Sequence, residues 1–472
     1  MKKFLALALA SAMLVSMLAG CANSGSGSDT SSAAAQDGAS SSAAEDVITV
    51  LAPPVTTDYN TKMDDWKADF HKQYPNLTLD VTATSWDDHS TKLSTMAQAG
   101  EAPDLAELDY SSIGTYVQNG TALDISKYMD ASQLADFNET ALDYMKIGDG
   151  TYGLPLYITI QALGANKDML EAAGVDVAKV QTSGWTYDEF LKAIEAGTNT
   201  GENCFGFVFA DSGSATSDFV KIFGVSAGLN NAFTSDLKYD YTSSKMLKLL
   251  TAVEEVTKSG YMPNYGVEAA QRMVMCETGK AMIFGKAMPL FENSINTNNA
   301  SLKSSDGNAV KGSIPVTYAF LPVPTMDGVS ESCYGQVDGY VAFRNKNCSD
   351  EHEKNVMTAL YYLCTGERAA YVDEATCLDG VCKTAQDILS KSTDDQRDAD
   401  NVACASRLTK EVVAPPTGLT ADQSAKATKI MNEVIVPKFQ ALLAGECTAQ
   451  EMYNEIVSQA TSAFGEDGCV LD

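Results

Sequence analysis

One segment has the spacing of a serine hydrolase nucleophile. Gly-Val-Ser-Ala-Gly at 224–228 matches GxSxG, in which a serine on a sharp strand-to-helix turn attacks an acyl carbon. The pattern requires a helix after the serine, but the stretch at 230–234 is typical of a loop. The downstream histidine, His352, lies between two glutamates in a solvated charged run. The sequence therefore argues against Ser226 as a nucleophile.

Paired carboxylates are the second possible source of chemistry. A glycosidase needs two of them on either side of the scissile bond. The chain has 62 aspartates and glutamates, so many pairs are possible and the sequence singles out none. A surface glycoside hydrolase stays an alternative.

Cysteine and histidine could hold a metal. The eleven cysteines contain no CxxC pair, and none of His71, His89 and His352 stands beside a second ligand at metal-site spacing. We therefore predict no metal and no cofactor. The pairing of cysteines in a secreted chain cannot be deduced from spacing, so disulfides are left open.

The thiol of Cys21 has a more specific setting. It follows Leu-Ala-Gly at 18–20 and an apolar run at 4–17 with a basic start. These are features of a signal peptide, and the run is shorter than the roughly 20 residues that span a bilayer. With its cysteine, the segment resembles a bacterial lipobox, in which the sulfur takes a diacylglycerol and the chain is cut just before it. We predict a lipoprotein signal peptide at 1–20 and lipidation, with palmitate among the acyl chains, at Cys21.

A tether is expected at 21–45. The residues after Cys21 are mostly serine, alanine and glycine, which cannot bury enough apolar surface to become ordered. A coil of this length reaches about 25–30 Å. The folded body would therefore be held at the extracellular face of the cell membrane.

The charge of the chain excludes one class of partner. It has 33 basic and 62 acidic residues, a net charge of −29. Nucleic acid has the same sign, so we do not expect it as a partner. The acidic residues are dispersed, as in a soluble surface that resists aggregation.

The length after the tether exceeds what one core usually organises, which predicts at least two lobes.

Strand and helix patterns alternate at the start of the body. The expected elements are a strand at 47–51, a helix with Met63, Trp66, Phe70 and Tyr74 on one face, a strand at 77–83, a helix at 91–99 and a strand at 102–108. This order predicts an α/β fold with a parallel sheet and covering helices. Ligands of such sheets bind at the carboxyl ends of the strands.

A series of short motifs follows in a fixed order. They are Tyr-Pro-Asn at 74–76, Gly-Glu-Ala-Pro-Asp at 100–104, Gly-Thr-Ala-Leu-Asp at 120–124, Tyr-Gly-Leu-Pro at 152–155, Asn-Lys-Asp at 166–168, Trp-Thr-Tyr-Asp-Glu-Phe at 185–190, Gly-Lys-Ala-Met at 279–282 and Leu-Pro-Val-Pro at 321–324. In order and spacing the chain resembles family 1 extracellular solute-binding proteins of carbohydrate ABC importers, relatives of the maltose-binding protein. Some motifs also have a structural explanation, because Thr186 and Glu189 fit a helix capping box beside which Trp185 would pack.

The resemblance implies a two-lobe periplasmic-binding-protein-like fold of type II, hinged, with discontinuous lobes. The expected lobes are 46–158 with 338–379 and 160–335 with 380–472. The expected crossings lie near 157–161, 335–338 and 378–384. It further implies a monomeric, non-enzymatic, lipid-anchored receptor that captures a carbohydrate between the lobes and delivers it to ABC permease subunits. A structural or adhesion lipoprotein, which would have no hinged cleft, is the other alternative.

Sugar sites combine aromatic faces with polar groups that bind hydroxyls. By the resemblance, the ligand-binding candidates are Tyr59, Asn60, Trp86, Asp88, Asp109, Tyr110, Tyr157, Gln161, Asp211, Ser214, Lys286, Tyr334 and Asp338. Each also fits a simpler role, since Asp88 could begin a helix and Tyr157 could belong to the core.

The chain departs from the usual carbohydrate pattern of the family at two places. Lys-Ala-Met at 286–288 and Thr-Gly-Leu at 417–419 stand where family members often carry tryptophan. Twenty tyrosines are available as substitutes. Lys286, if it faces the cleft, would indicate an anionic ligand such as an acidic sugar.

Overall fold

The computed structural model describes residues 45–472 except 57, 214, 347, 378–379, 392–396 and 417, and for Trp86 and Asp87 it describes the backbone alone. The expected signal peptide, Cys21 and nearly all of the expected tether lie outside the described residues. Within the described part, none of the helices combines the length and the apolar character needed to cross a bilayer.

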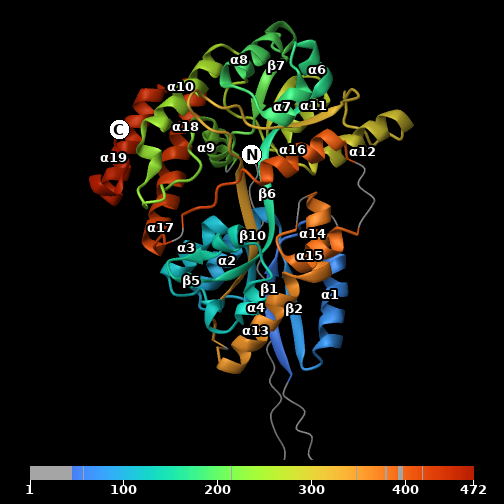
Figure 1. The fold of residues 1–472 in the computed structure, drawn as a ribbon, viewed down its shortest axis with the longest axis vertical. Helices are drawn as coiled ribbons and strands as arrows, with labels where there is room; N and C mark the ends of the chain where they lie inside the picture. Colours follow the sequence, from blue (N-terminus) through green and yellow to red (C-terminus); the bar gives the residue numbers. More distant parts are fainter. Residues whose placement is uncertain are drawn as a thin grey trace, which may run out of the picture. The chain divides into compact units, whose positions relative to one another are not determined.

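The first part of the body alternates strands and helices, as the sequence predicts (Figure 1). Its elements are β1 (Asp46–Ala52), α1 (Tyr59–Gln73), β2 (Leu77–Ala83), α2 (Trp86–Gln98), β3 (Leu105–Asp109), α3 (Tyr110–Gln118), η1 (Ile125–Lys127), α4 (Ala131–Leu134), α5 (Glu139–Asp143), β4 (Lys146–Ile147), β5 (Gly150–Thr151) and β6 (Gly153–Asn166). Helix α2 begins earlier than the expected 91, because the Ser85 hydroxyl caps it by accepting from the Asp88 amide.

The middle part forms the upper half of Figure 1. Its elements are α6 (Lys167–Ala172), α7 (Val177–Ser183), α8 (Tyr187–Ala196), η2 (Thr200–Glu202), β7 (Phe205–Phe209), α9 (Ala215–Gly224), η3 (Val225–Ala227), η4 (Asp240–Thr242), α10 (Ser244–Lys258), α11 (Gln271–Glu277), β8 (Ala281–Ala287), α12 (Phe291–Ser304) and β9 (Tyr318–Leu321). The capping box of Thr186 and Glu189 is present at the start of α8. Trp185 beside it is buried and donates through Nε1 to the Pro322 carbonyl at 2.9 Å, as a packing residue would.

The last part returns to the lower half and then to the upper half. Its elements are β10 (Tyr334–Ala342), α13 (Asp350–Leu363), α14 (Gly366–Thr376), α15 (Lys383–Leu389), α16 (Ala399–Thr409), α17 (Ala421–Ile430), the π-helical segment η5 (Met431–Ile435), α18 (Val436–Leu443), α19 (Ala449–Phe464) and η6 (Glu466–Gly468).

One sheet runs through both halves in the order β2-β1-β3-β10-β6-β8-β7, with β9 also paired to β6. Strand β1 is parallel to β2 and β3, as predicted, and β7 is parallel to β8. Strand β10 joins antiparallel to both β3 and β6. The sheet is therefore mixed rather than purely parallel.

Strand β6 belongs to two environments. Its first residues pair with β10, from Val341↔Gly153 to Tyr334↔Gln161, and residues from Ala162 on pair with β8 and β9. Separate hydrophobic cores lie on either side of this change, around β1, β3 and β10 below and around β7, β8 and β9 above. The structure confirms the two-lobe α/β fold.

The core of the first lobe includes residues further along the chain than the sequence suggested. The residues Cys382 and Ala385, at and after the start of α15, are buried in the core of the first lobe. The order of the motifs assigns residues from 380 on to the second lobe, and none of the motifs lies close enough to α15 to place that boundary. In the described residues the second core resumes with Cys404 of α16.

Candidate functional site

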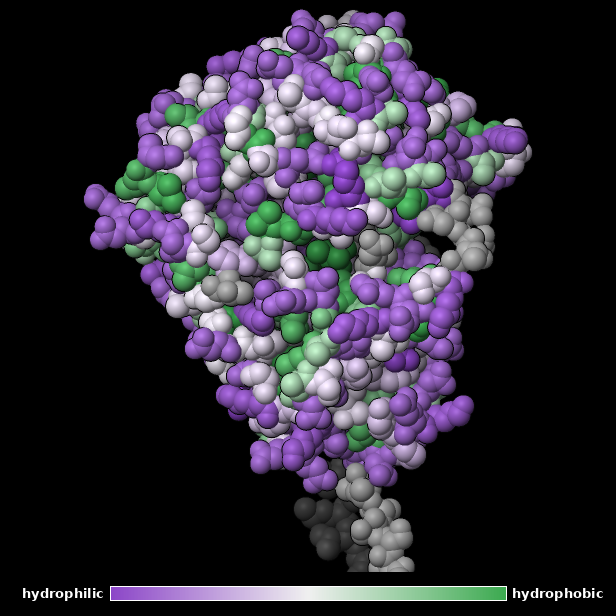
Figure 2. Space-filling view, viewed as in Figure 1, coloured by the Kyte–Doolittle hydropathy of each residue, from purple (hydrophilic) through white to green (hydrophobic). Residues whose placement is uncertain are grey.

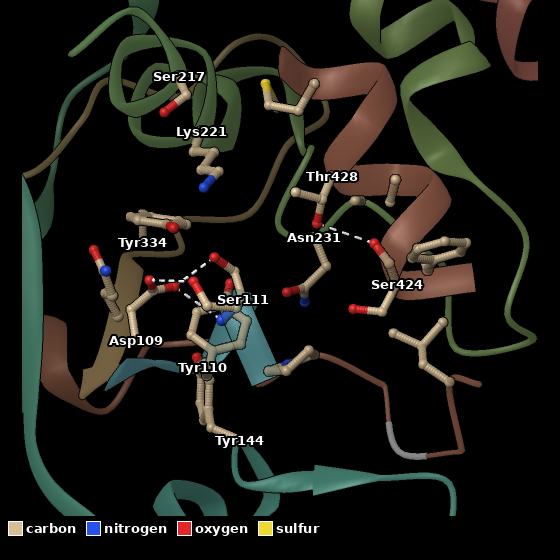
Figure 3. Close-up of a pocket in the computed structure, with 18 of the residues that line it drawn as sticks. Asp109, Tyr110, Ser111, Tyr144, Ser217, Lys221, Asn231, Tyr334, Ser424 and Thr428 are labelled. Atoms are coloured by element: carbon tan, nitrogen blue, oxygen red, sulfur yellow. Dashed lines mark hydrogen bonds between the residues drawn. The ribbon is translucent and has the colours of Figure 1, made fainter. Parts of the chain in front are cut away.

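A cavity of about 480 Å³ lies where the two lobes meet (Figure 3). From the first lobe this interlobe cavity is lined by the N-terminal turn of α3 and by Tyr144, Lys146 and Ile147. From the second lobe it is lined by α9, the loop at 230–233, Tyr241, Lys286, α17 and η5. Tyr334 and Gln336 of β10 contribute to its wall. Small-ligand sites occupy about 300–1,000 Å³, so its size fits a small molecule. The face of the protein that Figure 2 shows is largely hydrophilic.

Asp109 organises one side of the interlobe cavity. It ends β3 and caps α3, accepting from the Ser111 amide at 2.9 Å and from the hydroxyls of Ser111 and Ser112. An aspartate suits this position because its carboxylate satisfies amides that have no partner within the helix. The cap places Tyr110 at the cavity wall (Figure 3).

Tyrosines form the aromatic part of the wall. Tyr110 packs edge-on against Tyr144, with ring centroids 4.7 Å apart, and Tyr334 lies above them in Figure 3. Burial raises the pKa of the Tyr110 and Tyr334 phenols well above the ordinary value. These phenols are therefore neutral hydrogen-bonding groups at physiological pH.

The cavity also contains charged side chains. The Lys286 ammonium lies 3.1 Å from Asp218 Oδ2, and the Lys146 ammonium lies 2.5 Å from Asp143 Oδ1. Lys221 of α9 points into the cavity from above (Figure 3). The site thus offers aromatic faces, hydroxyls, amides and charges to one ligand.

Four of the residues named from the sequence line this cavity: Asp109, Tyr110, Lys286 and Tyr334. Gln161 lies behind the wall and donates to Gln336 Oε1 at 3.0 Å. Asp338 is paired in register with Asp109 across β10 and β3 and is 6% exposed.

Five other named residues lie away from the cavity lining. Tyr59 is in the first core with its hydroxyl 3.2 Å from that of Tyr340, and buried Tyr157 donates to Glu107 Oε1 at 3.3 Å. Buried Asp211 accepts from the amides of Gly266 and Val267, each at 2.8 Å. Asn60 is exposed on α1, and Asp88 accepts from the Ser85 hydroxyl at 2.7 Å in the first turn of α2. Ser214 and the side chain of Trp86 lie outside the description.

Several lining residues were not found from the sequence. Lys221, Asn231, Ser424 and Thr428 come from α9, a loop and α17, which no strand-end rule places at the site. One signal was present, because Lys221 interrupts the apolar run Phe-Val-Lys-Ile-Phe at 219–223. Lysine is rarely buried without a partner, so a single charge in such a run is a candidate functional position. Nothing comparable marks α17.

Two buried carboxyl groups lie behind the wall of the cavity. Burial, followed by repulsion from Asp109, raises the pKa of Asp338 to about 8, and Lys286 lowers it by less. Burial raises the pKa of Glu107 well above its ordinary range, and its Oε2 has no hydrogen-bond partner among the residues that the structure describes. Asp338 is therefore mostly protonated at neutral pH, and burial favours the neutral form of Glu107 as well.

Comparison with known proteins identifies the family. The family model of the bacterial extracellular solute-binding proteins matches residues 65–395. The chain belongs to this family. The match confirms the resemblance noted in the sequence.

Individual relatives of this solute-binding protein are distant. A binding protein of Brucella abortus (strain 2308) is 27% identical over 292 residues, which cover 60% of this chain and 65% of that protein, less than two thirds of its length. Among solved structures, a Listeria monocytogenes ABC substrate-binding protein in complex with cycloalternan has a TM-score of 0.67 at 17% identity, over 89% of this chain and 99% of that one. Maltose-bound MalE3 of T. maritima has a TM-score of 0.65 at 19% identity, over 88% and 99%. At these identities the structural likeness shows the fold alone.

The GxSxG segment of this solute-binding protein is not a nucleophile elbow. Ser226 lies in η3, is fully buried, and follows helix α9 rather than a strand. His352 lies between Asp46 and Asp104, with ring nitrogens 2.9 Å from a carboxylate oxygen of each. The serine hydrolase interpretation therefore has neither an exposed hydroxyl nor an available base.

Proposed function

We propose that the protein is the receptor of an ABC importer, which captures a sugar in the interlobe cavity and delivers it unaltered to the permease. The observation that carries this proposal is that the cavity wall is divided between the lobes, with α3 on one side and α9 and α17 on the other. A ligand touches both sides only when the lobes are close together. Binding therefore favours the closed arrangement by its differential affinity, and the permease would recognise that form.

The chemistry of the wall supports a sugar. Tyr110, Tyr144 and Tyr334 offer ring faces for the C–H surface of a pyranose, and Asn231 and Gln336 offer amides for its hydroxyls. The tyrosines take the place of the tryptophans that the family often uses. The structural neighbours that bind cycloalternan and maltose support the same ligand class.

Ligand capture is tested by thermal unfolding of the full chain with maltose, maltotetraose, D-galactose and D-galacturonate. A sugar at 100 times its Kd adds about 2.7 kcal/mol of stability, which raises Tm by several degrees. Tyr110→Ala should remove this rise, and Tyr265→Ala, at an exposed tyrosine outside the cavity, should keep it. Cleaved sugar after incubation, or no rise with any sugar, would contradict the proposal.

Membrane attachment through Cys21 is the second part of the proposal. It is supported by the lipobox-like sequence and by the tether after it. Cys21→Ala should move the protein from the membrane fraction to the soluble fraction and abolish labelling by a fatty acid. Cys348→Ala, at an exposed cysteine of the body, is the matched control and should leave both unchanged. Membrane retention of the Cys21 variant at the wild-type level would count against lipid anchoring.

A further inference from the structure

Lys221 differs from the other charged residues of the interlobe cavity in its surroundings. It lies on α9 one turn after Ser217 and Asp218, so that the three residues face the cavity together. Figure 3 shows its ammonium group directed into the space between Tyr334 and the start of α3.

The other charges of the wall are bound to protein groups. Lys286 is paired with Asp218 and Lys146 with Asp143, and the Asp109 carboxylate accepts three bonds from Ser111 and Ser112. Lys221 makes neither a hydrogen bond nor an ion pair with any residue that the structure describes.

Lys221 is nevertheless charged. Burial lowers the pKa of its ammonium, but Tyr110, Asp218, Asp109 and Tyr241 outweigh burial and raise it above the ordinary value. These groups surround the ammonium without bonding to it. The cavity therefore contains a protonated amine whose hydrogen-bonding capacity is open to a ligand.

The charge of the wall is opposite to that of the protein. Three lysines and two aspartates line the cavity, whereas the chain carries a net charge of −29. An acidic protein that concentrates lysine in its binding site is suited to admit an oxyanion there.

Closure around a ligand removes water from Lys221. A neutral ligand would offer the desolvated ammonium only hydroxyl groups, whereas an oxyanion would form a charge-assisted hydrogen bond with it. We propose that the ligand is a sugar carrying an oxyanion, such as a uronate, and that Lys221 binds that group. This inference rests on the proposed capture of a sugar in this cavity. It assigns to Lys221 the role that the sequence suggested for Lys286, whose ammonium is held by Asp218.

The test compares charged and uncharged sugars by isothermal titration calorimetry on the full chain. The charged probes are D-galacturonate, trigalacturonate and D-glucose 6-phosphate, so that the carboxylate and phosphate arms distinguish the two oxyanions. D-galactose and maltose are the uncharged probes. The variants are Lys221→Met and the control Lys303→Met, an exposed lysine of α12 outside the cavity.

We expect a charged probe to bind more tightly than its uncharged counterpart. Lys221→Met should lower the affinity for that charged probe at least tenfold and the affinity for uncharged sugars less than threefold. Lys303→Met should change neither affinity. Tm of the ligand-free variant checks that it folds. Binding of uncharged sugars alone would overturn the inference and leave the proposed function in place. Equal affinity of wild type and Lys221→Met for a charged probe would also overturn it, and failure of every sugar would remove the proposed function with it.

Discussion

The two lobes are connected by contacts of different kinds. Strands β6 and β10, here called the hinge strands, share a ladder of backbone hydrogen bonds from Gly153 to Gln161. Helices α3 and α17, here called the rim helices, touch through small side chains, with Gly114 of α3 facing Ser424 of α17. The ladder holds its two strands together by regular backbone hydrogen bonds, whereas a small-residue contact separates without exposing much apolar surface. We infer that the hinge strands serve as the pivot and that the rim helices part when the cleft opens.

The largest effect is expected from Gly339→Ala in the hinge strands. A Cβ at Gly339 would lie 2.2 Å from the Leu154 carbonyl oxygen and 2.9 Å from Pro155 Cα, both backbone atoms of β6. Because backbone cannot move aside as a side chain does, we expect a loss of about 3 kcal/mol of unfolding free energy or more. Urea denaturation measures it.

Gly201→Ala is the matched control. Gly201 is exposed, and a Cβ there would make one contact, at 3.4 Å from Asn199 Oδ1. It should change the unfolding free energy by about 0.5 kcal/mol or less. Equal stability of the Gly339 variant and wild type would show that the hinge ladder tolerates local displacement.

The next effect concerns the pH dependence of the hinge strands. The pKa of Asp338 is raised from 3.8 to about 8, first by burial and then by Asp109. Between these two pKa values, Asp338 is protonated in the folded state and ionised in the unfolded state. This group favours folding fully below pH 4, and its contribution falls as pH rises from about 4 to about 8.

Asp338→Asn should remove this dependence, because the amide has a similar shape and does not ionise. We expect the variant to gain unfolding free energy relative to wild type between pH 5 and pH 8, by up to about 1.4 kcal/mol per pH unit. Asp422→Asn, at an exposed aspartate of the rim helix α17, is the control and should follow the wild-type profile. Parallel profiles for wild type and Asp338→Asn would mean that Asp338 ionises normally in the fold.

The hinge and the rim also differ in how far the sequence predicted them. Strands β1, β2 and β3 follow from β-branched and alternating patterns, and residues at the end of β3 and on β10 led to Asp109, Tyr110 and Tyr334 of the site. These positions could be predicted because they depend on the local periodicity of the sequence and on the ends of strands at one edge of the sheet.

The rim could not be read in the same way. Helix α17 is about 300 positions from α3, and a contact between glycine and serine leaves no mark in the sequence pattern. Tyr59, Tyr157 and Asp211 were named as site residues because a loop or strand-end position does not show which way a side chain points. Their burial depends on the tertiary packing of each core.

The smallest effect is expected from Gly114→Ala in the rim helices, and it should change the free energy of ligand binding. A Cβ on Gly114 would lie 2.3 Å from the Ser424 hydroxyl oxygen and 2.6 Å from its Cβ. Gly114→Ala should therefore push α17 away from α3 and weaken sugar binding about tenfold, or about 1.4 kcal/mol. Stability should not fall, because alanine is about 1 kcal/mol better than glycine inside a helix.

The partner residue makes this prediction specific. Adding Ser424→Gly removes the atoms that clash, so the double variant should regain most of the affinity, and the coupling between the two changes measures the rim contact. Calorimetry with the sugar identified by thermal unfolding gives the four affinities of the cycle. Additive effects would mean that α17 does not depend on Gly114 for its position. The rim would then be as rigid a junction as the hinge strands, and the distinction between pivot and parting contact would be lost.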